Sequence, residues 1–352
     1  MPDPLSAPAA ILFDEGHGQS LWFSAPPTVD QGFSQAAALA GERRPVTFAP
    51  AGRRFSPEAL AGCAALVLPM GPQRQTNLTQ DEIEAVHDFV RGGGGLLVLG
   101  AYTGDWHHEA NLSRLIERYG ISFNRDVVLP AGADPDDAFV AAGNLARAMR
   151  CLVEALPNPA AGRLRALIEQ VDVVAALSCC SLYVDEGMAR PILRARPDSL
   201  IAEPEPAGAG IHILGYLDRG RGPAILAAAS TTAKVVVVGS WRPFLDVFLA
   251  EPRYSNRQFF ANILDHLLAG ASSGPARPVA ALPAPAPAPS PNPRLGAVED
   301  RLRDRRALLV QLEKEVVLAT GLERATLNVR IDQTKQAIAS DEAELDELHR
   351  RG

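Results

Sequence analysis

Polar side chains that could perform acid–base or binding chemistry follow an apolar run near the start of the sequence. The run covers residues 11–13, and the side chains after it are those of Asp14, Glu15, His17, Gln19 and Trp22. The run is too short for a helix, and its stop at Gly16 is typical of a buried parallel strand. Open α/β sheets bind ligands just beyond the carboxyl ends of such strands, so this stretch has a position suited to function.

Two later stretches repeat this arrangement. Thr103, Asp105, Trp106, His107 and His108 follow an apolar run at 96–99, and Ser240, Trp241 and Arg242 follow one at 235–238. If these runs are strands of one parallel sheet, the three polar loops share one edge. They would then form a polar pocket floored by aromatic rings, suited to a small ligand, a sugar or a peptide. The expected ligand- or partner-contacting side chains are those of Asp14, Glu15, His17, Gln19, Trp22, Thr103, Asp105 and Trp241.

Other interpretations of these side chains remain open. The polar groups could instead cap helix N-termini and bind one another. A hydrolase could use Asp14, His17 and Asp105 for acid–base or metal chemistry. A metal site of Asp105, His107, His108 and His17 is disfavoured, because adjacent histidines rarely point the same way.

Two further motifs suggest chemistry but favour structural roles. Ser240 follows an apolar run, yet its surroundings read G-S-W-R-P rather than the G-x-S-x-G of a nucleophile elbow. The four glycines at 92–95 precede a strand and no Walker lysine follows them, so they predict a helix end and a tight turn.

Composition narrows the class of protein. The chain has 352 residues, of which 47% are hydrophobic, and a net charge of −7 that argues against nucleic-acid binding. The four cysteines, Cys63, Cys151, Cys179 and Cys180, lack C-x-x-C spacing and indicate neither zinc nor a disulfide framework. The start lacks the basic region of a signal peptide, and no apolar stretch reaches about 18 residues. We therefore expect a cytoplasmic protein with no membrane insertion, and the motifs indicate no cofactor or metal.

Alternating strand and helix patterns predict the fold of residues 8–271. Apolar runs at 11–13, 46–49, 65–68, 96–99 and 235–238 predict strands, and helical patterns lie near 31–41, 56–62, 79–91, 111–119 and 255–269. The clearest helix begins after Thr79, where Glu82 completes a capping box, and ends at Gly92. This order implies an α/β domain with a mainly parallel, flavodoxin-like sheet. Residues 131–234 are less regular, with strand-like runs at 171–184 and 223–230 that we expect to elaborate the same domain.

A linker rich in proline and alanine separates this body from a C-terminal tail. Residues 272–293 favour extended polyproline II and could span about 60–70 Å at about 3.1 Å per residue. Residues 294–352 carry apolar side chains at three- and four-residue steps, interrupted by a turn at Gly321, which predicts a coiled-coil-like helical hairpin. Its apolar stripe contains Leu302, Leu309, Leu312, Leu327, Ile331, Ile338 and Leu345. One hairpin has a thin core, so we expect the stripe to dock to a protein partner or to itself. The alternative is a hairpin that folds back and covers a patch on its own body.

Several stretches in order resemble the GIFT domain, found in the gliding-motility transporter subunit GldG and in an intraflagellar-transport subunit. The specific parts are LTQDEIEAVHDFVRGGGGLLVLG (78–100) and NLSRLIERYGISFNRDVV (111–128). The family belongs to the class I glutamine-amidotransferase-like superfamily. The resemblance implies a non-catalytic recognition module, and the tail more loosely resembles helical hairpins that act as adaptors in multi-gene bacterial systems.

This sequence departs from the amidotransferases at their catalytic position. Those enzymes carry a nucleophilic cysteine at the elbow after a central strand, whereas the elbow here reads Gly100, Ala101 and Tyr102. Cys179 and Cys180 lie in an apolar run, where a thiol is usually a small buried hydrophobe. We therefore expect an adaptor of a multicomponent bacterial system rather than an enzyme.

Overall fold

The computed structural model describes residues 9–17, 32–50, 52–71, 77–133, 149–204, 216–221, 223–270 and Lys335. All of these except Lys335 belong to one compact unit of the chain, Met1–Val279. The predicted linker and, apart from Lys335, the predicted hairpin lie outside the described residues, as do Gln19 and Trp22.

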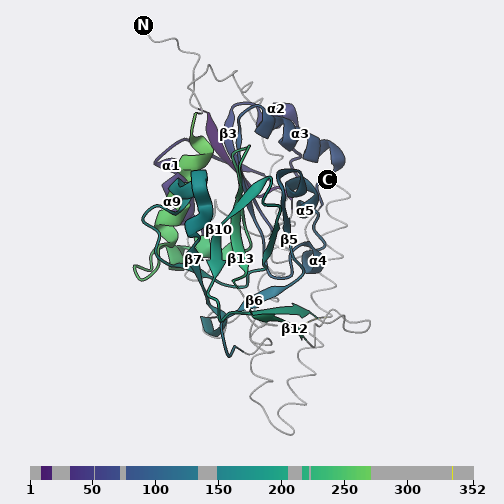
Figure 1. Cartoon of the computed structure of the whole chain (residues 1–352). Helices are drawn as coiled ribbons and strands as arrows, with labels where there is room; N and C mark the ends of the chain where they lie inside the picture. Colours follow the sequence, from purple (N-terminus) through teal and green to yellow (C-terminus); the bar gives the residue numbers. More distant parts are fainter. Residues whose placement is uncertain are drawn as a thin grey trace. The chain divides into compact units, whose positions relative to one another are not determined.

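A sheet of nine strands forms the centre of this unit, in the order β2-β1-β3-β4-β14-β13-β10-β7-β8 (Figure 1). Its strands are β1 (Ala10–Asp14), β2 (Val46–Ala49), β3 (Cys63–Pro69), β4 (Gly95–Leu99), β7 (Val153–Pro157), β8 (Val174–Ala176), β10 (Ala189–Ala195), β13 (Ile225–Ser230) and β14 (Val235–Val238). Every residue of β4 and β14 is buried, which suits the continuous apolar runs that predicted both strands.

The sheet has a parallel half and an antiparallel half, which meet at β14. The strands from β2 to β14 pair in parallel. From β14 to β8 every pairing is antiparallel. The predicted parallel α/β layer is thus confirmed as one half of a mixed sheet, and the less regular residues supply much of the other half.

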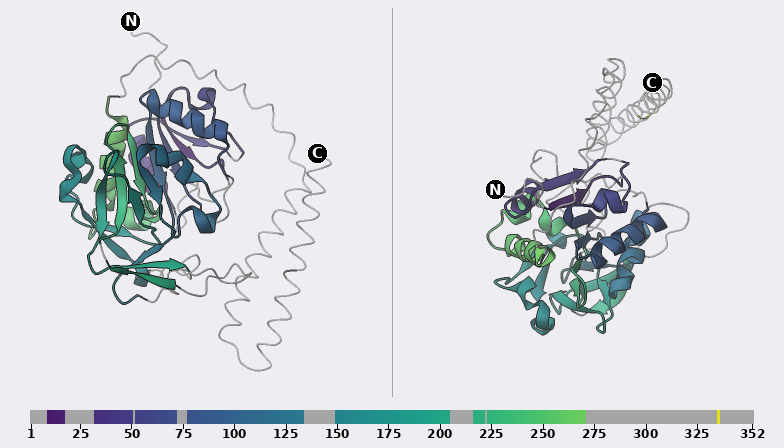
Figure 2. Two further views of the ribbon diagram at one scale, coloured as in Figure 1. Left: turned by 45° about the vertical axis from the view of Figure 1, so that its right-hand side comes forward. Right: turned by 90° about the horizontal axis from the view of Figure 1, so that it is seen from above.

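Helices cover both faces of the parallel half (Figures 1 and 2). The helices are α1 (Ser34–Gly41), α2 (Pro57–Leu60), α3 (Gln80–Arg91), α4 (Asp105–His108), α5 (Leu112–Ile116), α8 (Asp246–Leu249) and α9 (Asn256–Leu268), with 3-10 turns η1 (Glu117–Tyr119), η3 (Met149–Cys151), η4 (Pro159–Ile168) and η5 (Arg242–Phe244). Helices α1 and α9 contact each other on one face, and α3 lies with α2 and α5 on the other. None of the helices in the described residues is long and apolar enough to cross a membrane.

Helix α3 begins as its sequence predicts. The Thr79 side chain accepts from the Glu82 backbone N–H, and the Glu82 carboxylate accepts from the Thr79 N–H at 2.9 Å. This capping box satisfies two backbone donors that a helix start leaves unpaired. The apolar face with Ile83, Val86 and Val90 is buried against the sheet.

Two small sheets accompany the main one. One contains β12 (Tyr216–Arg221), β11 (Leu200–Pro204) and β6 (Val127–Leu129), seen at the bottom of Figure 1. The other pairs β5 (Ile121–Phe123) with β9 (Leu182–Val184). The strand-like run 171–184 therefore divides into β8 and β9, which belong to different sheets, because Ser178 between them has a positive φ of 48°.

Candidate functional site

The three predicted polar loops leave the same edge of the parallel half. Strands β1, β3, β4 and β14 are successive neighbours and parallel, so their carboxyl ends coincide. The loop after β4 begins beside the end of β14, since the Gly100 N–H donates to the carbonyl of Val238, the last residue of that strand, at 2.7 Å. The end of the β1–α1 connection joins them, because the Phe33 ring lies 5.8 Å from the Trp241 ring.

The loop after β1 folds back onto its own strand. The Asp14 carboxylate accepts from the Gly16 N–H at 3.0 Å, and the His17 Nδ1 lies 2.9 Å from Asp14 Oδ2. Gly16 is required here because a Cβ would lie 2.9 Å from the Pro50 carbonyl oxygen. The Gly16 carbonyl in turn accepts from the Gly52 N–H at 2.8 Å, which ties this loop to the segment after β2.

The other nitrogen of the His17 ring binds the start of α3. His17 Nε2 lies 2.8 Å from Glu82 Oε1, and the same carboxylate accepts from the Phe55 N–H at 3.1 Å and from Arg54 at 3.1 Å. Glu82 therefore caps its helix and anchors two loops at once. The side chains of Asp14, His17 and Glu82 are all buried.

Both ring nitrogens of His17 face carboxylates, so the ring is best satisfied as an imidazolium. Burial alone would lower the pKa of His17, but the hydrogen bonds and charges of Asp14 and Glu82 outweigh it and raise that pKa above its usual 6.5. Burial likewise opposes ionisation of Glu82, yet its bonds with His17, Thr79 and Phe55 lower its pKa to about 2. The three side chains form a buried unit in which His17 joins Asp14 to Glu82.

The loop after β4 makes a strained turn into α4. Thr103 has a φ of 61°, unusual for a β-branched residue, and Gly104 follows with a φ of 55°. The Thr103 N–H donates to the Asp126 carbonyl at 2.7 Å, and its hydroxyl donates to the Tyr102 carbonyl at 2.6 Å. The Asp105 carboxylate accepts from the backbone N–H groups of Leu112 (3.0 Å) and Ser113 (2.8 Å), so it caps α5.

The loop after β14 holds its side chains by bonds to other elements. The Ser240 hydroxyl donates to the Leu177 carbonyl at 2.7 Å and accepts from the Arg242 N–H at 3.1 Å. The Pro243 carbonyl accepts from the Asn256 amide at 2.9 Å. Trp241 is buried against Phe33, and the Arg242 guanidinium lies 5.0 Å from the Trp241 ring.

The structure thus places most of the predicted site residues inside the fold. Asp14, Glu15, His17, Thr103 and Trp241 are buried, and Asp105 is half-buried. Asp14 and His17 are in contact, whereas the Asp105 carboxylate binds the backbone of α5. The alternative interpretation, in which these groups cap helices and bind one another, describes the bonds of Asp14, His17 and Asp105. Among the described residues, no three His, Cys, Asp or Glu side chains are arranged to hold a metal ion.

The described cysteines are poorly placed for nucleophilic chemistry. Burial raises the pKa of Cys179 to about 12, and burial also raises that of Cys180 well above its ordinary value. The Cys180 backbone N–H donates to the Gly239 carbonyl at 3.0 Å, so this segment lies across the end of β14.

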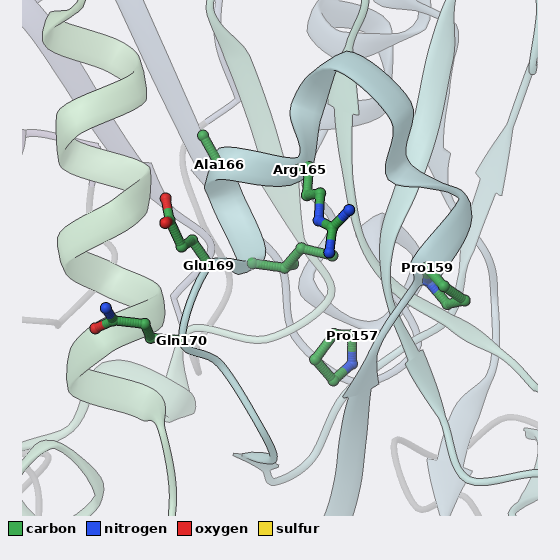
Figure 3. A pocket seen from close by; sticks show the side chains of 7 residues that line it. Pro157, Pro159, Arg165, Ala166, Glu169 and Gln170 are labelled. Atoms are coloured by element: carbon green, nitrogen blue, oxygen red, sulfur yellow. The ribbon is translucent and has the colours of Figure 1, made fainter.

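A surface hollow of about 720 Å³ lies away from these residues, between the end of β7 and η4 (Figure 3). It is lined by Pro157, Pro159, Arg165, Ala166, Ile168, Glu169 and Gln170. In Figure 3 the Glu169 and Gln170 side chains point away from the two prolines. A second, apolar hollow of about 320 Å³ lies between α2 and α3. Neither hollow is lined by a side chain from the polar loops of the sheet edge.

Comparison with known proteins supports the resemblance found in the sequence. The family model of the IFT52 GIFT domain matches residues 53–174. The solved structure described as the mmIFT52 N-terminal domain is similar with a TM-score of 0.50 and 16% sequence identity, over 72% of this chain and 99% of that chain. The structural likeness shows a shared fold. None of the curated proteins matches this chain.

Sequence reasoning missed several side chains of this edge. Glu82 was predicted only as a helix cap, yet it also binds His17 and Arg54. Tyr102 and Arg242 were not among the expected ligand contacts. Burial raises the pKa of the Tyr102 phenol, and the nearby charge of Arg242 offsets part of that rise. The available signal was a lone arginine within the apolar stretch W-R-P-F-L at 241–245.

Proposed function

We propose that this protein is a non-enzymatic adaptor of a multicomponent bacterial assembly. The α/β body recognises a ligand or partner at the carboxyl edge of its sheet, and the C-terminal hairpin docks to another component. The match of residues 53–174 to the GIFT domain of IFT52 carries this proposal, because the resemblance implies a recognition or scaffold module. In this proposal the α/β body spans residues 8–271, the linker 272–293 and the hairpin 294–352. The protein is cytoplasmic, and the parallel half of its sheet is of the flavodoxin-like, amidotransferase-like type.

The bonding of the acid–base groups supports this proposal. His17 uses both ring nitrogens for internal carboxylates, and the Asp105 oxygens accept from backbone N–H groups of α5. A general base needs a free acceptor within reach of its substrate. The groups that a hydrolase would need therefore already serve the fold.

The alternative is a hydrolase that uses Asp14, His17 and Asp105. Its support is the contact between Asp14 and His17, at 2.9 Å, which resembles the orientation of a base by a carboxylate. Activity profiling of the wild type and of Asp105→Asn, with and without divalent metals, tests this alternative. A metal- or Asp105-dependent hydrolysis would favour the enzyme over the adaptor.

The docking role is tested on the full chain in its native bacterium. Cross-linking followed by mass spectrometry would compare Leu309→Asp/Ile331→Asp, which places charges in the predicted stripe, with the control Gln311→Asp/Gln333→Asp outside it. We expect the stripe variant alone to lose a reproducible partner encoded near this gene. An unchanged set of cross-linked partners in both variants would contradict docking through the hairpin.

A further inference from the structure

The guanidinium of Arg242 is buried, and no described residue supplies it with an anionic partner. Arg242 is only 8% exposed. In the described part of the chain its neighbours are the Trp241 ring, 5.0 Å away, and the Tyr102 phenol, and it forms no ion pair with a carboxylate. A buried charge is normally paired, because removing it from water is costly. The fold therefore keeps a cation that an anion from outside the described residues would satisfy.

The backbone that carries this cation is held in place by bonds to neighbouring elements. The Arg242 backbone N–H donates to the Ser240 hydroxyl. The carbonyl of Pro243, the next residue of η5, accepts from the Asn256 amide, which also donates to the Ala175 carbonyl of β8. Trp241, the residue before Arg242, packs against Phe33. A cation carried on a well-held backbone suits a binding site, because less ordering remains to be done when the ligand arrives.

His108, whose ring also lies beside Tyr102, provides a second group without a good hydrogen-bond partner. It is 1% exposed, and neither ring nitrogen forms a well-aligned hydrogen bond with any described residue. Its ring lies 5.1 Å from the Tyr102 ring and 5.2 Å from the His107 ring. Burial, assisted by His107, lowers the pKa of His108 to about 4, although the nearby backbone of Tyr102 and Gly71 offsets part of the fall. The ring is therefore neutral and offers one donor and one acceptor.

The topology places these groups at a switch point of the sheet. The chain leaves β4 toward α4 and α5, which lie with α3, and leaves β14 toward α9 on the opposite face (Figure 2). Open α/β sheets bind ligands where neighbouring strands diverge in this way. A second divergence, between β1 and β3, is filled by the internal bonds of Asp14, His17 and Glu82. At the divergence between β4 and β14, by contrast, the described residues give Arg242 no carboxylate partner and leave the ring nitrogens of His108 without a well-aligned hydrogen bond.

We propose that the edge between β4 and β14 binds a ligand that carries a carboxylate and a second oxygen acceptor. The guanidinium of Arg242 pairs with the two carboxylate oxygens, and the N–H of His108 donates to the second acceptor. A planar guanidinium matches a carboxylate with two parallel hydrogen bonds. This inference deepens the recognition role proposed above and rests on it for its biological purpose.

The charges favour a carboxylate over a phosphate dianion. The site offers one buried cation and a neutral imidazole, so a single negative charge is compensated and a second one would remain buried and unpaired. A small hydroxy acid and the C-terminus of a polypeptide share the required chemistry, since each has a carboxylate near another oxygen. The experiment must therefore separate these two sources.

Calorimetric titration of the full chain at constant ionic strength tests the inference. The probes are lactate, N-acetyl-alanyl-alanine, its C-terminal amide and inorganic phosphate. Binding of lactate alone identifies a small acid, and binding of the peptide acid but not its amide identifies a polypeptide C-terminus. Failure of both carboxylates to bind, or tighter binding of phosphate or of the amide, would overturn the proposal.

Two variants locate the binding. Arg242→Gln should weaken the bound carboxylate at least tenfold, while Arg253→Gln, which removes an exposed charge bonded to Glu251, should leave affinity unchanged. His108→Ala should weaken binding of the carboxylate as well. In the wild type, an NMR signal of the His108 ring should shift on titration with the carboxylate, a test that does not depend on the folding of any variant. Equal affinity in Arg242→Gln and wild type would place the binding elsewhere and refute the site. An unchanged set of cross-linked partners in both hairpin variants, with carboxylate binding retained, would instead contradict only the docking role.

Discussion

His17 Nε2 lies 2.8 Å from a carboxylate oxygen of Glu82, although 65 positions separate the two residues in the chain. The contact joins the exit of β1 to the first turn of α3. Both side chains are buried, so their charges are weakly screened. The stability of the parallel half should therefore depend on this pair.

Removing the Glu82 charge should destabilise the protein strongly. Glu82→Gln leaves the His17 imidazolium with one carboxylate and weakens the acceptor of Phe55 and Arg54, and breaking a buried pair of this kind costs about 3–5 kcal/mol. Urea unfolding at neutral pH measures the change. Glu84→Gln, two positions along the same helix and half-exposed, is the control and should stay within about 0.5 kcal/mol of wild type. Similar losses in both variants would contradict a special role for Glu82.

The same pair should make stability depend on pH with a definite sign. The pKa of His17 is raised by folding, so its contribution is fully present below about 6.5 and is lost as the pH rises through the raised value. The pKa of Glu82 is lowered to about 2, so its contribution is present above its ordinary value and is lost as the pH falls toward 2. Urea midpoints of wild type and His17→Gln across this range test the claim. The decline of the wild-type urea midpoint above about pH 6.5 should be absent from His17→Gln. If the variant shows the same decline, another titrating group causes it.

Local signals in the sequence were sufficient for the parallel half. The strands β1, β2, β3, β4 and β14 lie where apolar runs placed them, and Thr79 with Glu82 forms the predicted capping box. These features depend on neighbouring residues only. The carboxyl-edge location of the polar loops followed from the same local pattern.

The remaining features depend on contacts between distant segments. The division of residues 171–184 into two strands requires a positive φ at Ser178, a position where neither glycine nor proline marks a turn. The bonds of His17 to Glu82 and the burial of Arg242 arise from packing of elements far apart in the chain. No spacing in the sequence reports which of several polar groups at one edge will pair and which will stay unsatisfied.

Residues 177–181, which follow β8, leave no room for a side chain at position 239. A Cβ there would lie 2.1 Å from the Cys180 carbonyl oxygen, a backbone atom that cannot rotate away. Gly239→Ala should therefore cost about 1–3 kcal/mol or more, measured as a lower urea midpoint. Gly41→Ala, at the end of α1, is the matched control, because a methyl group there would meet no atom within 4 Å, and it should stabilise by about 0.5–1 kcal/mol. A neutral Gly239→Ala would show that residues 177–181 do not close over β14.

Replacing His108 by leucine should stabilise the protein and weaken its binding of a carboxylate. The variant removes a buried ring whose nitrogens have no well-aligned partner among the described residues, a defect that costs about 1–3 kcal/mol. Because folding lowers the pKa of His108 to about 4, the wild type should lose up to about 1.4 kcal/mol per pH unit from this residue as the pH falls below 6.5.

That acid-side loss should be smaller in His108→Leu, as measured by urea unfolding between about pH 4 and 7. His87→Leu is the control, because His87 is buried as well but bonds the Leu115 carbonyl at 3.0 Å, so its loss should destabilise by about 0.5–1.5 kcal/mol. A site kept for binding explains why a sequence would retain a destabilising histidine, since stability is commonly sacrificed where ligands are held. Equal destabilisation by both substitutions would show that His108 serves packing, and the argument for an unsatisfied binding group would fail with it.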